Sequence, residues 1–190
     1  MYKICKTEQS AKRQRMLAEG LLKAMQEQPY EEITVSDLCG RLQVPRKTFY
    51  RYFENKDDAL HALIDHTLLD YQKFELLHVG DIPPREGADL ELYFLFWKQH
   101  EKLLDVLMQG SLSAVLVARA LLNAMNEAKQ MRRYLNVDNE AEARAAILFV
   151  IGGLTSMMIE WHSTGCQQSA GQMAETARKL LMRPLLLMKN

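Results

Sequence analysis

Hydrophobic residues recur at helical spacing along almost the whole chain, and this pattern is the strongest structural signal in the sequence. Leu17, Leu21 and Met25 mark the buried side of a first helix, which we predict from about Glu8 to Gln28. Val, Ile and Thr do not cluster into alternating runs, and no Asn-Gly or Asp-Gly pair signals a hairpin. The sequence therefore predicts an all-α fold.

The same spacing predicts further helices in the rest of the chain, separated by segments rich in Gly, Pro, Asn or Asp. Their expected ranges are residues 57–77, 89–108, 112–126 with a continuation to Arg133, 140–163 and 169–187. The clearest loop is predicted at residues 80–87, which contain two prolines and two glycines. Asn139 or Asp138 is expected to cap the long helix that follows.

Residues 34–56 stand out because they predict two short helices joined by a tight turn. Thr34 is a good N-cap, and Asp37 at the third helical position completes an arrangement like a capping box. A break at residues 43–45 ends this helix, because proline disfavours helical geometry in the residue before it. The second helix is expected to run from about Pro45 to Phe53.

Helical spacing divides the side chains of this second helix between two faces. Phe49, Tyr52 and Phe53 fall on the inward face. The outward face then carries four side chains rich in positive charge, Arg46, Lys47, Tyr50 and Arg51. A short helix with exposed Arg and Lys near its N-terminus fits the major groove of DNA.

Charge is distributed unevenly, although the formal net charge of the 190 residues is zero. Residues 1–56 hold 11 Lys and Arg against 7 Asp and Glu, whereas residues 57–190 hold 13 against 17. The positive excess therefore lies where a phosphate backbone would be met. This split suggests a DNA-binding domain over residues 1–56 and a second helical domain over residues 57–190.

The run from Thr34 to Lys56 resembles the helix-turn-helix domain of TetR-family transcriptional regulators. The resemblance rests on Thr34-Val35, Leu38, Val44, Thr48-Phe49-Tyr50, Phe53 and Lys56, followed by an apolar helix from Ala59. The chain departs from the family at Gln43, where glycine is usual, and at Pro45, where serine is usual. Gln43 must accept the backbone geometry that the turn demands.

The resemblance implies a cytoplasmic homodimer that binds a palindromic operator in double-stranded DNA, with repression as the expected sign. By resemblance, Thr34, Tyr50 and Lys56 would hold phosphates. Arg46, Lys47 and Arg51 are our candidates for base edges, since Arg and Lys reach guanine in the groove. Thr48 would serve either role.

A dimer surface is predicted on the long helix over residues 140–163 and on the last helix. The candidate stripe is apolar and consists of Ile147, Val150, Ile151, Leu154, Met158 and Trp161. The alternative is that this stripe is buried within its own chain. By resemblance, the last two helices of each protomer would form a four-helix bundle.

The aromatic-rich segment after the loop is the best candidate for an effector pocket. Its residues offer apolar bulk with a few polar groups, and methionines adapt to varied apolar ligands: Tyr93, Phe96, Trp97 and His100, with Met125, Met131 and Met157. A small apolar or amphipathic effector is expected by resemblance. The alternatives are that these residues form ordinary core, or that a protein partner replaces the effector, which a pocket filled by Phe96 and Trp97 would favour.

Other functional classes find little support in the sequence. The carboxylates are scattered, and no phosphate loop, nucleophile motif or cluster of metal ligands occurs, so we expect no enzyme, cofactor or metal. Three widely spaced cysteines fit a reducing cytosol better than a disulfide framework. The longest apolar stretch, residues 145–159, is shorter than a bilayer requires, so no membrane span is expected.

Overall fold

The computed structural model describes residues 2–3, 5–78, 80–81, 87–128 and 137–182. These residues form helices and no strand, which confirms the all-α prediction. Residues 82–86 of the predicted loop, residues 129–133 of the expected continuation to Arg133 and the expected helix end at Leu187 lie outside the described residues.

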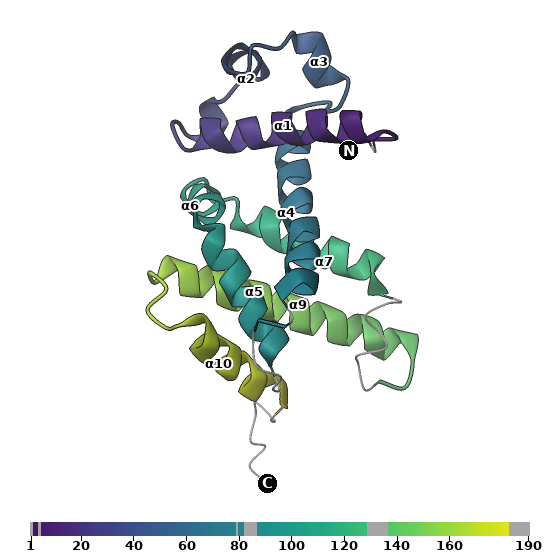
Figure 1. The fold of residues 1–190 in the computed structure, drawn as a ribbon, viewed down its shortest axis with the longest axis vertical. Coiled ribbons are helices and arrows are strands. Elements are labelled where there is room, and N and C mark those ends of the chain that lie inside the picture. The colour runs from purple at the N-terminus through teal and green to yellow at the C-terminus, as the bar shows by residue number, and fades with distance from the viewer. Residues whose placement is uncertain (1, 4, 79, 82–86, 129–136, 183–190) are drawn as a thin grey trace. The chain divides into compact units, whose positions relative to one another are not determined.

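Figure 1 shows the order of the helices along the chain. Two of them begin with side-chain caps that the sequence predicts. Thr34 caps α2, and Asn139 Oδ1 accepts a hydrogen bond of 2.9 Å from Glu142 N at the start of α9. The bounds are α1 Glu8–Met25, η1 Tyr30–Glu32, α2 Val35–Arg41, α3 Arg46–Tyr50, α4 Lys56–His78, α5 Ala88–Gln99, α6 Glu101–Gln109, α7 Ser113–Asn126, α9 Glu140–Ser163 and α10 Ala170–Met182.

The chain divides into two compact units. The first contains the residues up to Leu68 together with Lys102–Arg119, and the second contains Leu69–Glu101 and the residues from Ala120 onward. Both α4 and α7 therefore contribute to both units. A functional boundary after residue 56 stays a prediction.

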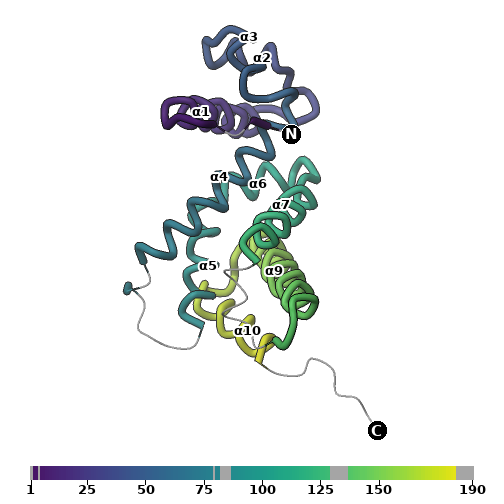
Figure 2. Tube along the Cα trace, turned by 90° about the vertical axis from the view of Figure 1, so that its right-hand side faces the viewer, coloured from purple at the N-terminus to yellow at the C-terminus, as the bar shows by residue number. Residues whose placement is uncertain are grey.

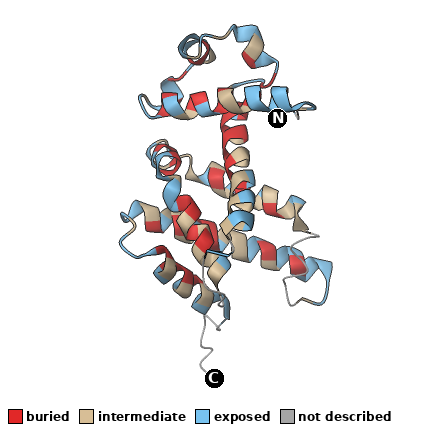
Figure 3. Ribbon diagram, in the orientation of Figure 1, coloured by how far each residue is buried: buried red, intermediate tan, exposed pale blue. Residues whose placement is uncertain are grey.

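In the first unit, α1, α2 and α3 share a core with the beginning of α4 (Figure 3). α1 contributes Leu17 and Leu21, which have no exposed surface, and α2 contributes Leu38. The end of α2 approaches α1 so closely that a Cβ atom on Gly20 would lie 2.5 Å from the Leu42 Cδ1 atom. The absence of a side chain at Gly20 therefore permits this packing.

In the second unit, α10 lies along α5, as Figures 1 and 2 both show. Phe94 of α5 is fully buried and meets Trp161 of α9 edge to face, with ring centroids 5.5 Å apart. The Trp161 indole N–H donates to the Gln168 carbonyl at 2.9 Å. This bond ties the connection between α9 and α10 to the core.

The helix predicted over residues 89–108 is wrong in one respect, because the structure divides it into α5 and α6 at His100. The His100 ring stacks on Phe96, with centroids 4.1 Å apart, and its Nδ1 lies 2.9 Å from the Phe96 carbonyl oxygen. His100 itself has φ −107° and ψ 25°, outside helical geometry. Apolar spacing continues across this break, so the periodicity alone does not reveal it.

Candidate nucleic-acid interface

The turn between α2 and α3 holds its shape with an unusual backbone angle at Gln43. Gln43 has φ +52°, in the left-handed region that favours glycine. The Gln43 and Val44 N–H groups donate to the carbonyls of Gly40 and Cys39, at 3.1 and 3.0 Å. This confirms that Gln43 must accept a strained geometry, which the resemblance to glycine-containing turns predicts.

Pro45 acts as the N-cap of α3 and lies just outside the helix rather than at its first position. Its ψ of 141° is extended, and it makes no side-chain capping bond. α3 then extends only from Arg46 to Tyr50 and is shorter at both ends than we predict. The chain continues in bonded turns, with Phe53 N donating to the Phe49 carbonyl at 3.1 Å.

The predicted inward side chains of α3 and of the turn that follows it are buried. Phe49 is 0% exposed, Tyr52 7% and Phe53 1%. The Phe49 and Phe53 rings lie 5.2 Å apart between centroids. Burial of three aromatic rings fixes the orientation of α3, since each ring covers a large apolar area.

The outward face of α3 is also as predicted. Arg46, Lys47 and Arg51 are exposed, Thr48 is partly exposed, and 43% of Tyr50 is exposed. Arg46 Nη2 donates to the Tyr50 hydroxyl at 3.2 Å, and the guanidinium carbon lies 5.7 Å from the centre of that ring. The hydrogen bond to Tyr50 raises the pKa of Arg46. The pair presents one ordered, charged group at the helix surface.

Thr34 closes the capping box that the sequence predicts for α2. Its hydroxyl accepts from Asp37 N at 3.1 Å and donates to Asp37 Oδ2 at 2.5 Å, while Thr34 N donates to the same oxygen at 3.2 Å. These bonds lower the pKa of the Asp37 carboxyl. Thr34 is exposed beside the turn, but Asp37 accepts from both of its donors, so a phosphate would have to replace Asp37 as their acceptor.

Lys56 is a second phosphate-binding candidate, after Thr34, whose donors are already used within the chain. Its ammonium group donates to the carbonyls of Tyr30 at 2.6 Å, Glu31 at 3.0 Å and Ile33 at 3.0 Å. An ammonium has three N–H donors, so this arrangement leaves none for a phosphate. Lys56 also lies 4.4 Å from the centre of the Tyr30 ring. The structure thus makes Lys56 a clamp on the η1 turn.

Tyr30 completes this clamp and is a residue that sequence reasoning missed. It is 7% exposed, and its hydroxyl donates to Asp57 at the start of α4. Burial, together with the bond to Asp57, raises the pKa of the Tyr30 phenol. Since its partners lie more than 20 residues away along the chain, periodicity offers no signal for it.

Two short helices at a tight turn, the second with buried rings on one face and cations on the other, define a helix-turn-helix DNA-binding domain. Residues 18–63 match the family model of the bacterial regulatory proteins, tetR family. The match lies in the first compact unit and identifies residues 18–63 as a DNA-binding domain of the TetR type.

A curated relative matches the same part of the chain. It is the HTH-type dhaKLM operon transcriptional activator DhaS of Lactococcus lactis subsp. lactis (strain IL1403), 33% identical over 52 residues. The match covers 27% of this chain and 28% of DhaS, so it relates the two proteins over about a quarter of their lengths.

Solved structures extend the likeness of fold to nearly the whole chain. The dihydroxyacetone kinase operon activator DhaS superposes with a TM-score of 0.56, 15% identity and coverage of 90% of this chain and 94% of that one. The fatty acid degradation regulator FadR from Bacillus halodurans superposes with a TM-score of 0.58 and 16% identity. That match covers 95% of this chain and 98% of the FadR chain. The family whose model matches consists of bacterial regulatory proteins, which agrees with the predicted class of a regulator rather than an enzyme.

The predicted effector-pocket residues of α5 form a filled aromatic cluster. Phe96 and Trp97 are 2% and 1% exposed, and Tyr71 and Phe74 of α4 contact Phe96 with centroids 5.3 and 5.5 Å apart. Burial raises the pKa of the Tyr93 phenol, whose neighbours include Thr155 and Trp97. The rings of Tyr93 and Trp97 lie 6.4 Å apart. The aromatic side chains of this cluster therefore pack against one another.

Of the three methionine candidates, the structure describes Met125 and Met157. Met125 of α7 is half-buried. Met157 of α9 lines a hollow of about 600 Å³ that is open to solvent, together with Glu160, Trp161 and Gln168. None of Tyr93, Phe96, Trp97 and His100 lines this hollow. Met131 lies outside the described residues.

The predicted dimer stripe requires a correction. Ile147 and Met158 have no exposed surface, and Leu154 and Trp161 are 8% and 4% exposed within the single chain. Side chains that the chain's own core already covers add little area to an interface with a second copy. Val150 and Ile151 are half-buried. The exposed apolar face of α9 is a neighbouring one, which contains Leu148 and Phe149.

Proposed function

We propose that the chain binds a DNA operator as a homodimer and regulates transcription from it. The outward face of α3 carries this proposal, because Arg46, Lys47 and Arg51 are exposed while the opposite face is anchored in the core. These cations are the proposed readers of base edges. Thr34 and Tyr50 are proposed to hold phosphates, and Thr48 serves either purpose.

Selection of duplexes from random DNA, followed by fluorescence anisotropy, tests this assignment. Arg46→Ala is expected to relax the preference at one base pair, with a loss of about 1–3 kcal/mol on the selected duplex. Tyr50→Ala is expected to weaken binding to all sequences alike. Lys98→Ala removes an exposed cation of the second unit and serves as the control. Equal affinity for all these proteins would overturn the assignment.

Dimerisation is proposed through the exposed apolar face of α9. Leu148 and Phe149 are 45% and 63% exposed, and Gly152 and Gly153 adjoin them on the helix. Among the described helices, α9 alone is long and apolar enough to cross a membrane. Its most apolar 18-residue stretch has a mean hydropathy of 1.5, and only 28% of that stretch is buried within the chain. We propose that a second copy covers this face, together with the exposed Leu180 and Leu181 of α10.

Sedimentation velocity at micromolar concentration measures this interface. The wild type is expected to sediment as a dimer of the 21.9 kDa chain, and Leu148→Glu as a monomer. Leu76→Glu alters a leucine that is 78% exposed on α4 and should leave the dimer intact. A monomeric wild type would contradict the proposal. So would a wild type that partitions into lipid vesicles, because a cytoplasmic protein remains in the aqueous phase.

For control of DNA binding, the filled aromatic cluster favours a second candidate, a protein partner in place of a small apolar or amphipathic effector. Phe96 and Trp97, which we predict to line the effector pocket, are only 2% and 1% exposed. Thermal melting against a panel of hydrophobic compounds separates the two, since a ligand that binds only the folded state raises the melting temperature. Repeated stabilisation would restore the small-molecule effector.

Repression remains the proposed sign of regulation, in which the bound dimer excludes polymerase from a promoter. Activation is the alternative, and it is the sign that the name of DhaS gives for that protein. In vitro transcription from a promoter that contains the selected operator decides between them: transcript should fall as protein is added. A rise would assign activation.

A further inference from the structure

A short N-terminal segment is bound to the end of the recognition helix. The Lys3 N–H donates to the Tyr52 carbonyl at 3.1 Å, and the Lys3 carbonyl accepts from Gln14 Nε2 at 2.7 Å. Gln14 is a 3% exposed polar residue of α1. The Tyr2 ring meets Phe53 edge to face, with centroids 6.4 Å apart. Tyr2 and Lys3 thus contact the two residues that anchor α3 from its C-terminal side.

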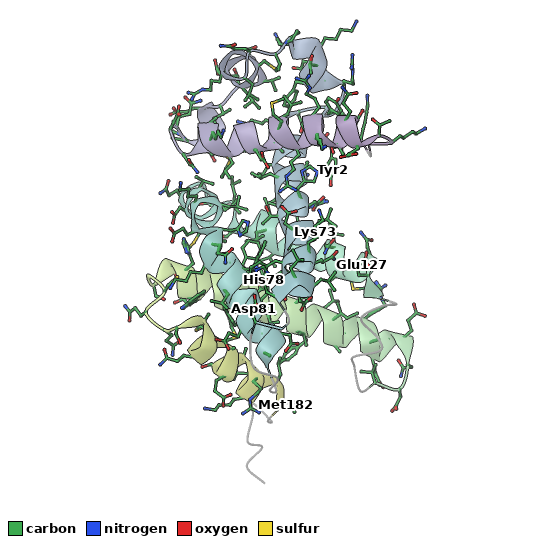
Figure 4. The ribbon with its side chains drawn as sticks, viewed as in Figure 1. Tyr2, Lys73, His78, Asp81, Glu127 and Met182 are labelled. Carbon is green, nitrogen blue, oxygen red and sulfur yellow. The ribbon has the colours of Figure 1, made fainter. Side chains whose placement is uncertain are left out.

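The Tyr2 side chain also reaches an ion pair between α4 and α7. Its hydroxyl donates to Asp65 Oδ2 at 2.5 Å, and Arg119 Nε donates to Asp65 Oδ1 at 2.8 Å, with a further Arg119 bond to Oδ2. The side chains of Asp65 and Arg119 are 14% and 23% exposed. Burial raises the pKa of the Tyr2 phenol, so the hydroxyl keeps its proton. Figure 4 marks Tyr2 beside α4.

We propose that Tyr2 and Lys3 form a strap that couples the position of α7 to the recognition helix, with Asp65 and Arg119 as positioning residues for DNA binding. All of these residues belong to the first compact unit. The inference rests on the proposed DNA-binding function and adds a regulatory connection to it. None of the four side chains lies on the outward face of α3, so each acts through the placement of that helix.

The physical basis is that two donors on Arg119 fix the Asp65 carboxylate in one orientation. A carboxylate held by a bidentate arginine presents a defined lone pair to the Tyr2 hydroxyl. When α7 moves relative to α4, Arg119 withdraws and the carboxylate is free to rotate. Tyr2 then loses its fixed acceptor, and the strap releases the Tyr52 carbonyl and the Phe53 ring. A shift of α7 therefore alters the order of the segment that follows α3.

Three variants test the strap in the full chain: Tyr2→Phe, Arg119→Met and the double variant. Each single change is expected to weaken binding to the selected duplex about tenfold, and the double variant no more than either one, because both remove the same connection. The slope of affinity against salt should stay that of the wild type, since no phosphate contact is lost. Arg119→Lys is expected to restore part of the affinity.

Matched controls exist in the second unit. Tyr71→Phe removes a tyrosine hydroxyl that donates to the Glu75 carboxylate at 3.3 Å, and Arg178→Met removes an arginine that holds Glu175 through two donors. Both are expected to bind the duplex as the wild type does. Amide exchange by NMR gives a local reading: in Arg119→Met, the Lys3 amide should lose protection while the amides of α1 keep theirs.

The outcomes separate this inference from the function on which it rests. A wild type that binds no duplex would remove the DNA-binding proposal itself. A wild type that binds, with Tyr2→Phe and Arg119→Met binding equally well, would overturn the strap alone. Additive losses in the double variant, or protection lost uniformly across α1, would also overturn it, because they indicate two unrelated effects or general destabilisation.

Discussion

Replacement of Lys56 by methionine isolates the clamp on η1 from any contact with DNA. Methionine keeps an unbranched apolar chain over the Tyr30 ring but removes all three donors to the carbonyls of Tyr30, Glu31 and Ile33. A hydrogen bond from a charged group contributes about 1.5–3 kcal/mol when buried, and partial exposure of Lys56 reduces this. The loss of three bonds should then lower the free energy of unfolding by about 2–4 kcal/mol.

Thermal unfolding by circular dichroism measures the effect. For a chain of this length we expect the melting temperature to fall by roughly 5–15 °C. Below that transition, the salt dependence of binding to the selected duplex should match that of the wild type. Lys47→Met is the matched control, because Lys47 is exposed on α3. This variant should keep the melting temperature of the wild type, and the slope of its log affinity against log salt concentration should be smaller.

The opposite pattern would refute the reasoning. In that pattern, Lys56→Met melts at the wild-type temperature, while the slope of log affinity against log salt concentration falls by about one. That result would mean that Lys56 holds a phosphate in the complex. The three carbonyl bonds would then be a feature of the unbound protein only.

Further predictions concern the turn, the packing of α1 and a half-buried acid. Gln43→Gly should be more stable than Gln43→Ala by about 1 kcal/mol in urea unfolding, since only glycine accepts φ +52° without strain; equal stabilities would contradict a strained turn. Gly20→Ala should lower stability by about 1–3 kcal/mol through contact with Leu42, whereas Gly40→Ala, which meets no atom within 4 Å, should not; similar results for both would count against the close packing. Burial raises the pKa of Glu75, so ionisation of this carboxyl lowers the stability of the fold above that pKa. Glu75→Gln should therefore melt at a higher temperature than the wild type at pH 7, and the difference in melting temperature should vanish as the pH falls through about 4.3. A difference that grows in acid would contradict the raised pKa.

Features set by local sequence could be predicted with their residues. The capping box of Thr34 and Asp37 needs only residues three apart, and the structure contains it. The division of α3 into inward rings and outward cations follows from 3.6 residues per turn. The bounds of α9 agree with the predicted 140–163 because an asparagine cap and a glycine stop delimit it.

Features set by distant contacts could not be predicted in this way. The donors of Lys56 are used by carbonyls more than 20 residues earlier, and Tyr2 meets Asp65 across 63 residues. The long apolar helix α9 has hydrophobic residues on several faces, so spacing alone did not say which face the core takes. Ile147 and Met158 are buried in the core, whereas Phe149 is exposed. The break at His100 depends on stacking against Phe96 within a continuous apolar pattern.

The central claim is that the outward face of α3 enters DNA, and backbone-amide NMR on the selected duplex tests it most directly. On addition of the duplex, we predict that the largest shift changes fall on residues 46–51 and at Thr34, while the amides of α5 and α10 keep their positions. Changes centred on α5 or α10, with the α3 amides unmoved, would contradict the account.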